Sequence, residues 1–196
     1  EHIEISTPLS NLASFYQTHG QYGKAETLYK RSLKIREKTY GPDHNSISLL
    51  LNNLAGLFVN QGRYSEAESL FKRSLLTGQR ALGFKHPMIG TTLNNWAGLI
   101  ESQGKGVEAE ALYKRSLKIK EDAFGADHPE VAITLGSLAA LYSKTNRFND
   151  AEELFLRSLS IFENAFGPKH IFAAITMNNL AILYKNYGRY GKANTL

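Results

Sequence analysis

Residues 51–67, LNNLAGLFVNQGRYSEA, contain two helical patterns separated by a short break. The first pattern is an apolar stripe with the spacing i, i+3, i+4 and i+7, made by Leu51, Leu54, Ala55 and Phe58. That spacing places the four side chains on one face of a helix. Gly62 follows, and glycine readily takes the left-handed conformation that ends a helix. A second stripe begins at Ala67. The stretch therefore predicts a helix, a tight turn and a second helix.

The same pattern recurs every 42 residues without an insertion. Five of the six histidines keep this step, at positions 2, 44, 86, 128 and 170. The break between the helices keeps it too, as Gly20, Gly62, Gly104, Asn146 and Gly188. The predicted repeats are 2–43, 44–85, 86–127 and 128–169, with a partial repeat at 170–196. A hairpin cannot bury its apolar stripe alone, so hairpins in register must stack. We therefore expect an all-α chain that forms one domain over 1–196, a right-handed superhelical solenoid of helix-turn-helix repeats.

Composition limits the class of protein. Of 196 residues, 42% are hydrophobic and 11% aromatic, which suffices for a continuous core. The aromatic residues recur on the helical stripes and are expected in that core. No apolar run is long enough to span a bilayer, so we expect no membrane contact. The chain has no cysteine, which suits a reducing compartment, and the cytoplasm is the expected location. Because the repeat pattern is still running at the last residue, we expect a piece of a longer protein.

The net charge of +5 raises the question of nucleic acid, which binds clustered Lys and Arg side chains. Here the basic residues are spread over the repeats. In three copies a Glu precedes a Lys by four residues, a favourable pairing on an exposed helix: Glu26 and Lys30, Glu68 and Lys72, and Glu110 and Lys114. We interpret these residues as solvated helix faces and expect no nucleic-acid partner. RNA-binding helical repeats also use a different period and paired polar code positions.

No catalytic or metal-binding arrangement is predicted. Histidines one repeat apart lie about 10 Å or more from each other, the distance of packed helices, whereas the ligands of one metal ion lie about 2 Å from it. The histidines are instead expected in the turns between repeats, where they hydrogen-bond a helix start. No phosphate-binding loop and no nucleophile, base and acid set can be assembled above chance. We therefore expect no enzyme activity, no metal and no cofactor.

A candidate binding surface lies on the face of each first helix that points away from the core stripe. It carries asparagine pairs beside small or apolar residues. An Asn side chain offers both a donor and an acceptor, so a row of them can pair with the main chain of an extended peptide. The alternative is that these amides bond to each other and keep the repeats in register. The predicted groove residues are Asn11, Asn52, Asn53, Asn94, Asn95, Asn178, Asn179, Leu49, Thr91, Ile133, Lys144 and Lys185.

The repeat resembles the tetratricopeptide consensus over the whole chain. Residues 51–55, 61–64, 66–68, 72–75 and 125–129 are similar, more narrowly, to the 42-residue repeats of kinesin light chains and their bacterial relatives. The resemblance implies that the second Asn of each pair grips peptide ligands, here Asn11, Asn53, Asn95 and Asn179. Kinesin light chains also use basic groove residues to select acidic, tryptophan-containing segments. In this chain the lining is mostly Thr, Ser, Leu and Ile, with Lys144 and Lys185 near one end and Arg36 and Lys120 on second helices.

These patterns leave two functions from different classes. The first is a protein-interaction scaffold that binds a peptide segment of a partner protein in its groove, with apolar anchors near Leu49 and Ile133. The alternative is a structural spacer, or a repeat module that associates end to end without a groove ligand. The sequence does not name the partner.

Overall fold

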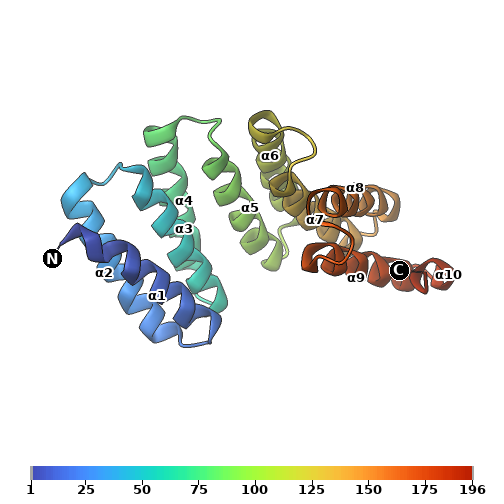
Figure 1. The fold of residues 1–196 in the computed structure, drawn as a ribbon, viewed down its shortest axis with the longest axis horizontal. Helices are drawn as coiled ribbons and strands as arrows, with labels where there is room; N and C mark the ends of the chain where they lie inside the picture. Colours follow the sequence, from blue (N-terminus) through green and yellow to red (C-terminus); the bar gives the residue numbers. More distant parts are fainter. Residues whose placement is uncertain (1, 196) are drawn as a thin grey trace. The chain divides into compact units, whose positions relative to one another are not determined.

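The protein, described here by a computed structural model over residues 2–195, consists of helices joined in antiparallel hairpins (Figure 1). A short 3-10 helix, η1 (Ile3–Ile5), precedes the α-helices. The described α-helices are α1 (Ser6–Thr18), α2 (Tyr22–Tyr40), α3 (Asn45–Asn60), α4 (Tyr64–Leu82), α5 (Pro87–Ser102), α6 (Gly106–Phe124), α7 (Pro129–Lys144), α8 (Phe148–Phe166), α9 (Ile171–Asn186) and α10 (Tyr190–Ala193). No strand occurs between residues 2 and 195. The predicted pair of helices in each repeat is confirmed.

The turn inside each hairpin has the predicted left-handed residue. Gly20 and Gly62 have φ values of 72° and 73°, and Asn146 has a φ of 59°. The backbone N–H of the next residue then returns to the first helix, as in the bond of 2.9 Å from Arg63 N to Phe58 O. This bond satisfies a carbonyl that the ending helix leaves open. Asn146 replaces glycine because asparagine tolerates this conformation better than most residues.

The turns between hairpins are closed by histidines that cap the next helix. The Nδ1 atom of His44 accepts a hydrogen bond from Ser46 N at 3.3 Å, and Nδ1 of His128 accepts one from Glu130 N at 3.1 Å. His86 and His170 make the same bond. The predicted structural role of these four histidines is confirmed. His2 precedes η1 without a side-chain cap.

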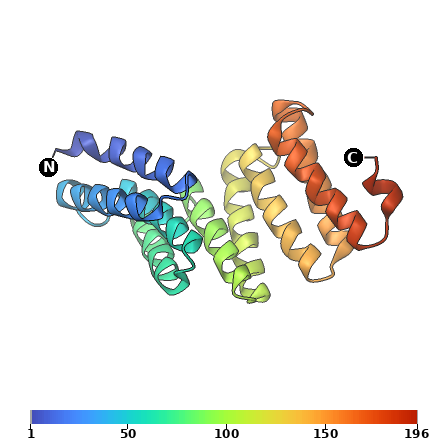
Figure 2. The same ribbon diagram turned by 90° about the horizontal axis from the view of Figure 1, so that it is seen from below.

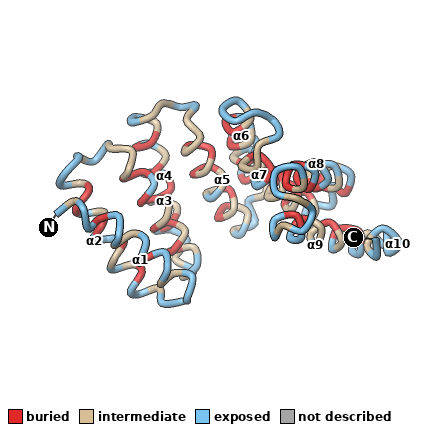
Figure 3. The backbone as a smooth tube through the Cα atoms, viewed as in Figure 1, coloured by how far each residue is buried: buried red, intermediate tan, exposed pale blue. Residues whose placement is uncertain are grey.

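The chain divides into two compact units, and each is described by itself. The N-terminal unit, Glu1–Leu99, contains α1 to α4 and most of α5. Within it α2 packs against α1 and α3, and α3 packs against α4. Its core runs between the helices, as the buried positions in Figure 3 show. Alanines and aromatic rings share this core, as Ala55, Ala67, Phe58 and Phe71 illustrate.

The C-terminal unit, Ile100–Leu196, contains the end of α5 and the helices α6 to α10. Here α7 packs against α6 and α8, and α8 packs against α9 (Figure 2, orange to red). Its core includes Val131, Leu135, Ile161 and Phe162.

The aromatic residues are only partly placed as predicted. Those at the positions of Phe58 and Phe71 are buried in nearly every repeat. Tyr64 and Tyr190, at the first position of second helices, are exposed, so the prediction of a core position is wrong for these two. At the same position Phe148 is buried beside Tyr184 and Tyr187, and Tyr22 is half-buried against the core.

Over residues 2–195, no helix combines the length and the apolar character needed to cross a membrane.

Candidate functional site

The predicted groove stripe lies on the solvent side of the first helices. On two of these helices the stripe consists of Leu49, Asn53, Gly56 and Asn60, and of Ile133, Ser137, Ala140 and Lys144. The spacing i, i+4, i+7 and i+11 places the members of each set on one helix face. Leu49 on α3 is 44% exposed although α3 packs against α1, α2 and α4. Ile133, at the same place on α7, is 39% exposed. Both helices pack against several neighbours, so these exposed apolar side chains do not belong to a chain end.

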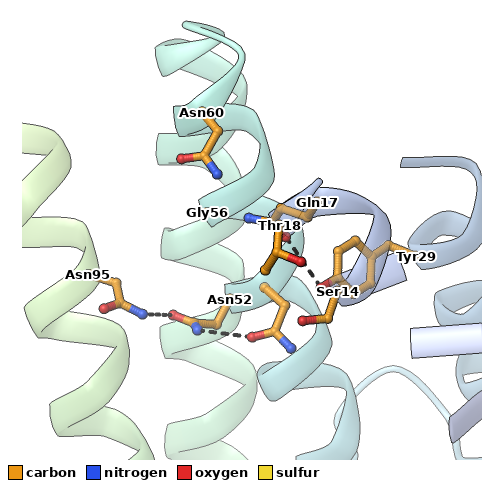
Figure 4. A pocket seen from close by; sticks show the side chains of 9 residues that line it. Ser14, Gln17, Thr18, Tyr29, Asn52, Gly56, Asn60 and Asn95 are labelled. Atoms are coloured by element: carbon orange, nitrogen blue, oxygen red, sulfur yellow. Dashed lines mark hydrogen bonds between the residues drawn. The ribbon is translucent and has the colours of Figure 1, made fainter. Parts of the chain in front are cut away.

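In the N-terminal unit this face forms a polar depression of about 360 Å³. Figure 4 shows the side chains that line it, from α1, α2, α3 and α5. The lining residues are Ser14, Gln17, Thr18, Tyr29, Asn52, Asn53, Gly56, Asn60 and Asn95. We call this depression the amide pocket. It contains no charged side chain, so its chemistry is that of neutral donors and acceptors.

Three amides of the amide pocket bond to one another. Nδ2 of Asn95 donates to Oδ1 of Asn52 at 3.2 Å, which joins α5 to α3 (Figure 4). Nδ2 of Asn52 in turn lies 3.5 Å from Oδ1 of Asn53, a long hydrogen bond. Asn52 is only 7% exposed, so the bond from Asn95 satisfies a buried acceptor. This arrangement favours the structural alternative for Asn52 and Asn95, and it leaves the Nδ2 donors of Asn53 available.

One wall of the amide pocket is fixed by Tyr29. Its ring is buried, and its hydroxyl donates to Oε1 of Gln17 at 3.4 Å. Burial raises the pKa of the Tyr29 hydroxyl, so it stays protonated and remains a donor. Asn60 lies at the end of α3 in the same pocket, is exposed, and makes no hydrogen bond with the described residues.

In the C-terminal unit the equivalent face forms an apolar depression of about 420 Å³. It is lined by Ala132, Ile133, Gly136, Ser137, Ala140, Ser158, Phe162, Phe172, Ile175, Thr176 and Asn179. We call it the isoleucine pocket. Small residues on α7 leave the hollow, and Phe162 from α8 and Phe172 from α9 wall it.

Most hydroxyl groups in the isoleucine pocket are already used. Ser137 donates to Ile133 O at 3.1 Å and Thr176 to Phe172 O at 2.9 Å, each inside its own helix. Ser158 donates to Ala132 O at 2.9 Å. Among the polar side chains of the lining, only the Asn179 amide makes no hydrogen bond with the described residues.

The two predicted groove lysines differ in their surroundings. Nζ of Lys144 lies 2.6 Å from Oε1 of Glu101, whose other oxygen accepts a bond of 3.0 Å from the Tyr113 hydroxyl. Burial and the neighbouring Glu101 raise the pKa of Tyr113, so this hydroxyl remains a donor. Lys185 is exposed on α9 and forms no ion pair with the described residues.

Two second helices, α2 and α6, each carry a buried cation. Arg36 is 9% exposed and donates to Ser6 Oγ, Thr7 Oγ1 and the Ser46 carbonyl. Burial lowers the pKa of the Arg36 guanidinium. Lys120, at the same position two repeats later, is 2% exposed. Its Nζ lies 3.3 Å from the Glu130 carbonyl and 2.9 Å from the Glu130 carboxylate.

The structure brings together only some of the predicted groove residues. Asn52, Asn53 and Asn95 meet in the amide pocket, and Ile133 and Asn179 meet in the isoleucine pocket. The remaining predicted residues line neither pocket: Asn11, Leu49, Thr91, Asn94, Asn178, Lys144 and Lys185.

Sequence reasoning did not place Gln17, Tyr29, Phe162 and Phe172 among the candidates. Tyr29 and Phe162 lie on second helices, which were treated as core. Phe172 lies three residues before Ile175, and residues at this spacing are neighbours on a helix surface. This spacing was the one signal in the sequence that could have placed Phe172 in the pocket.

The described residues include no group of three or more His, Asp or Glu side chains that could hold a metal ion. The site offers hydrogen bonds to neutral groups in one unit and apolar contact in the other. Such an arrangement can bind a ligand.

Comparison with known proteins agrees with the hairpin geometry. The sequence pattern of the family described as Tetratricopeptide repeat matches residues 4–75, 88–164 and 147–196. The crystal structure of BtubC (BKLC) from P. vanneervenii is similar, with a TM-score of 0.84 and 24% identity, over 98% of this chain and 77% of that one.

Two crystal structures of a putative kinesin light chain from Podosopora anserina, with nearly identical TPR-like repeats, have TM-scores of 0.79 and 0.78 at 23% identity. Each covers 100% of this chain and 92% of that chain. No curated protein matches the sequence. The predicted fold, an all-helical array of tetratricopeptide repeats, is confirmed.

Proposed function

Because the chain belongs to the tetratricopeptide repeat family, we propose that it is a protein-interaction scaffold that binds a peptide segment of a partner protein in its groove. The predicted groove residues are its binding surface. The structural neighbours support the fold, and the two pockets of this chain support binding.

The observation that carries the proposal is the amide pocket. It gathers amides from α3 and α5, hydroxyls from α1 and the Gln17 amide around one depression. An extended peptide presents N–H and C=O groups along its length, and each needs a partner when it leaves water. Asn53 and Asn60 supply such partners without a charge, so the pocket suits a main chain whatever its side chains are.

The test is a selection with a display library of extended peptides, kept from forming helices by regularly placed prolines. Peptides enriched on the wild type are then measured against Asn53→Ala combined with Asn60→Ala. Each lost hydrogen bond costs about 1–3 kcal/mol, so we expect binding to weaken at least tenfold. Thermal unfolding should change little, because Asn60 makes no hydrogen bond with the described residues and Asn53 accepts only the long bond of 3.5 Å from Asn52.

A matched control is Asn149→Ala, which removes an exposed amide on α8 outside both pockets. This variant should bind the enriched peptides as the wild type does. Peptides that bind the double variant with unchanged affinity would contradict the proposal. So would a large fall in unfolding temperature with binding retained, since the amides would then serve the fold alone.

The second candidate function is a spacer or self-associating module, and two observations favour it. The bond between Asn95 and Asn52 shows amides holding repeats together. On α1, Leu12 and Phe15 are 42% and 53% exposed, and a depression of about 490 Å³ lies beside Leu12. Concentration-dependent light scattering tests it: the mass should rise for the wild type and not for Leu12→Ser with Phe15→Ser. A monomeric mass at every concentration would contradict it.

A further inference from the structure

We propose that the isoleucine pocket of the C-terminal unit binds an amphipathic α-helix of a partner protein, with an aliphatic face and an acidic residue one turn beyond it. This inference rests on the proposed function and names the class of ligand for one part of the groove. It differs from the extended main chain proposed for the amide pocket.

The composition of the isoleucine pocket favours an apolar ligand. Ile133, Phe172 and Ile175 are exposed around it, and Ala140 and Gly136 leave the space between them open. No charged side chain lines the pocket. Covering it therefore removes apolar surface from water without burying a charge, which favours an aliphatic ligand face.

The hydrogen bonds of the isoleucine pocket favour a helical ligand over an extended one. An extended peptide laid across this pocket would bring main-chain N–H and C=O groups against apolar atoms. Ser137, Ser158 and Thr176 already donate their hydroxyl hydrogens to carbonyls, and only Asn179 has a fully available amide. Unpaired main-chain groups cost about 1–3 kcal/mol each. A helix satisfies its own main chain, so it can cover this surface without that cost.

The exposed surface of α9 has a length and a charge that an amphipathic helix can match. The exposed residues Ile175, Ile182 and Lys185 follow one another on this helix. From Ile175 to Lys185 the helix rises about 15 Å, roughly three turns. A ligand helix of matching length presents aliphatic residues at i, i+4 and i+7. Lys185 has no ion-pair partner among the described residues, whereas Lys144 is neutralised by Glu101. An acidic residue beyond the aliphatic face therefore complements Lys185.

The test uses a second display library beside the extended one: helical peptides of about 20 residues, long enough to form helix in water, with randomised residues on one face. The variant is Ile133→Thr with Ile175→Thr. Threonine is the residue that Thr7 and Thr91 provide at the same repeat position, so the fold should tolerate it. The control is Ile171→Thr, which changes an isoleucine that is exposed outside the pocket.

We expect helical peptides with an aliphatic face to be enriched and to bind the double variant at least tenfold more weakly than the wild type or the control. Lys185→Glu should weaken the same peptides and shift a repeated selection toward basic residues at their ends.

Three results would overturn the inference: enrichment from the extended library alone, helical peptides that bind the double variant unchanged, or no enrichment of helical peptides. The proposed function is judged separately, because extended peptides sensitive to Asn53→Ala and Asn60→Ala would support it even if the helical ligand fails.

Discussion

The two units use the same helical hairpin but differ in what lines the groove face. In the N-terminal unit the face carries amides: Asn95 on α5 donates to Asn52 on α3, and Asn52 donates to its neighbour Asn53. In the C-terminal unit, Gly136 and Ser137 stand where Asn52 and Asn53 stand in the other unit, and apolar residues surround them. One backbone design thus supports a polar surface and an apolar one. The stripe residues do not form the core, so they can change without loss of the fold.

The second helices differ in the same way. At one repeat position the chain has Arg36, Gly78, Lys120 and Phe162. Arg36 is buried among neutral groups, Lys120 has the Glu130 carboxylate, and Phe162 walls the isoleucine pocket. At Gly78 the neighbouring side chains lie so close that there is no room for a Cβ atom. This repeat position thus holds a buried cation in two repeats, a glycine in close helix contact in another, and an aromatic ring that lines a pocket in the fourth. The residues around it differ accordingly.

The largest expected effect comes from the close contact in the N-terminal unit. A Cβ atom at Gly78 would lie 2.7 Å from Ser48 Oγ and 2.9 Å from Ile89 Cδ1. Gly78→Ala should therefore destabilise the protein by about 1–3 kcal/mol, since the core must shift to admit a methyl group. Chemical denaturation of the variant measures this loss.

A comparison in the C-terminal unit is Gly136→Ala, at a glycine inside the first helix α7. There a Cβ atom would lie 3.8 Å from Ser158 Oγ, an ordinary contact. We expect a gain of about 0.5–1 kcal/mol, because alanine is the better helix former. If both variants lost stability equally, the difference in helix approach between the two sites would be disproved.

The next effect exchanges the surroundings of the two buried cations. Glu130→Ser gives Lys120 the neighbour that Arg36 has, and should destabilise by about 2 kcal/mol because a buried ammonium loses its carboxylate. Ser46→Glu gives Arg36 a carboxylate and should stabilise by about 1 kcal/mol. Equilibrium unfolding in urea measures both changes. A stability unchanged in Glu130→Ser would show that the carboxylate contributes nothing to holding Lys120.

The smallest effect concerns acid. Hydrogen bonds from Lys114, with further ones from Tyr142 and Arg147, lower the pKa of Glu110 from 4.5 to about 2, although burial opposes the shift. The folded value lies below the unfolded one, so the charged carboxylate stabilises the fold above about pH 4.5. That stabilisation disappears as the pH falls from 4.5 toward 2.

Glu110→Gln should remove this part of the pH dependence, with unfolding followed by circular dichroism across the acid range. Glu153→Gln, an exposed carboxyl on the same unit, is the control. The corresponding Glu26 of the N-terminal unit faces Phe58 in place of Tyr142, so it has one donor fewer. A wild type and a Glu110→Gln variant with parallel acid profiles would contradict this account.

Much of the architecture could be predicted from the repeat alone. The hairpin turns at Gly62 and Asn146, the histidine caps and the pairs of Glu and Lys depend on residues close together in sequence. The groove was predicted less well. The predicted residues included the amides but not Gln17, Tyr29 and Phe172, because each pocket depends on side chains from several helices at once.

The sequence by itself determined the period of 42 residues, the helix pairs, their caps and the face that each helix buries. These features follow from backbone conformation and from apolar spacing along a single helix, which local residues control. Tertiary structure alone decided that Asn95 bonds to Asn52, that Lys120 finds Glu130, and that small residues on α7 open a pocket. Those outcomes depend on side-chain rotamers and on the distance between packed helices, and both are set only when segments far apart in sequence meet.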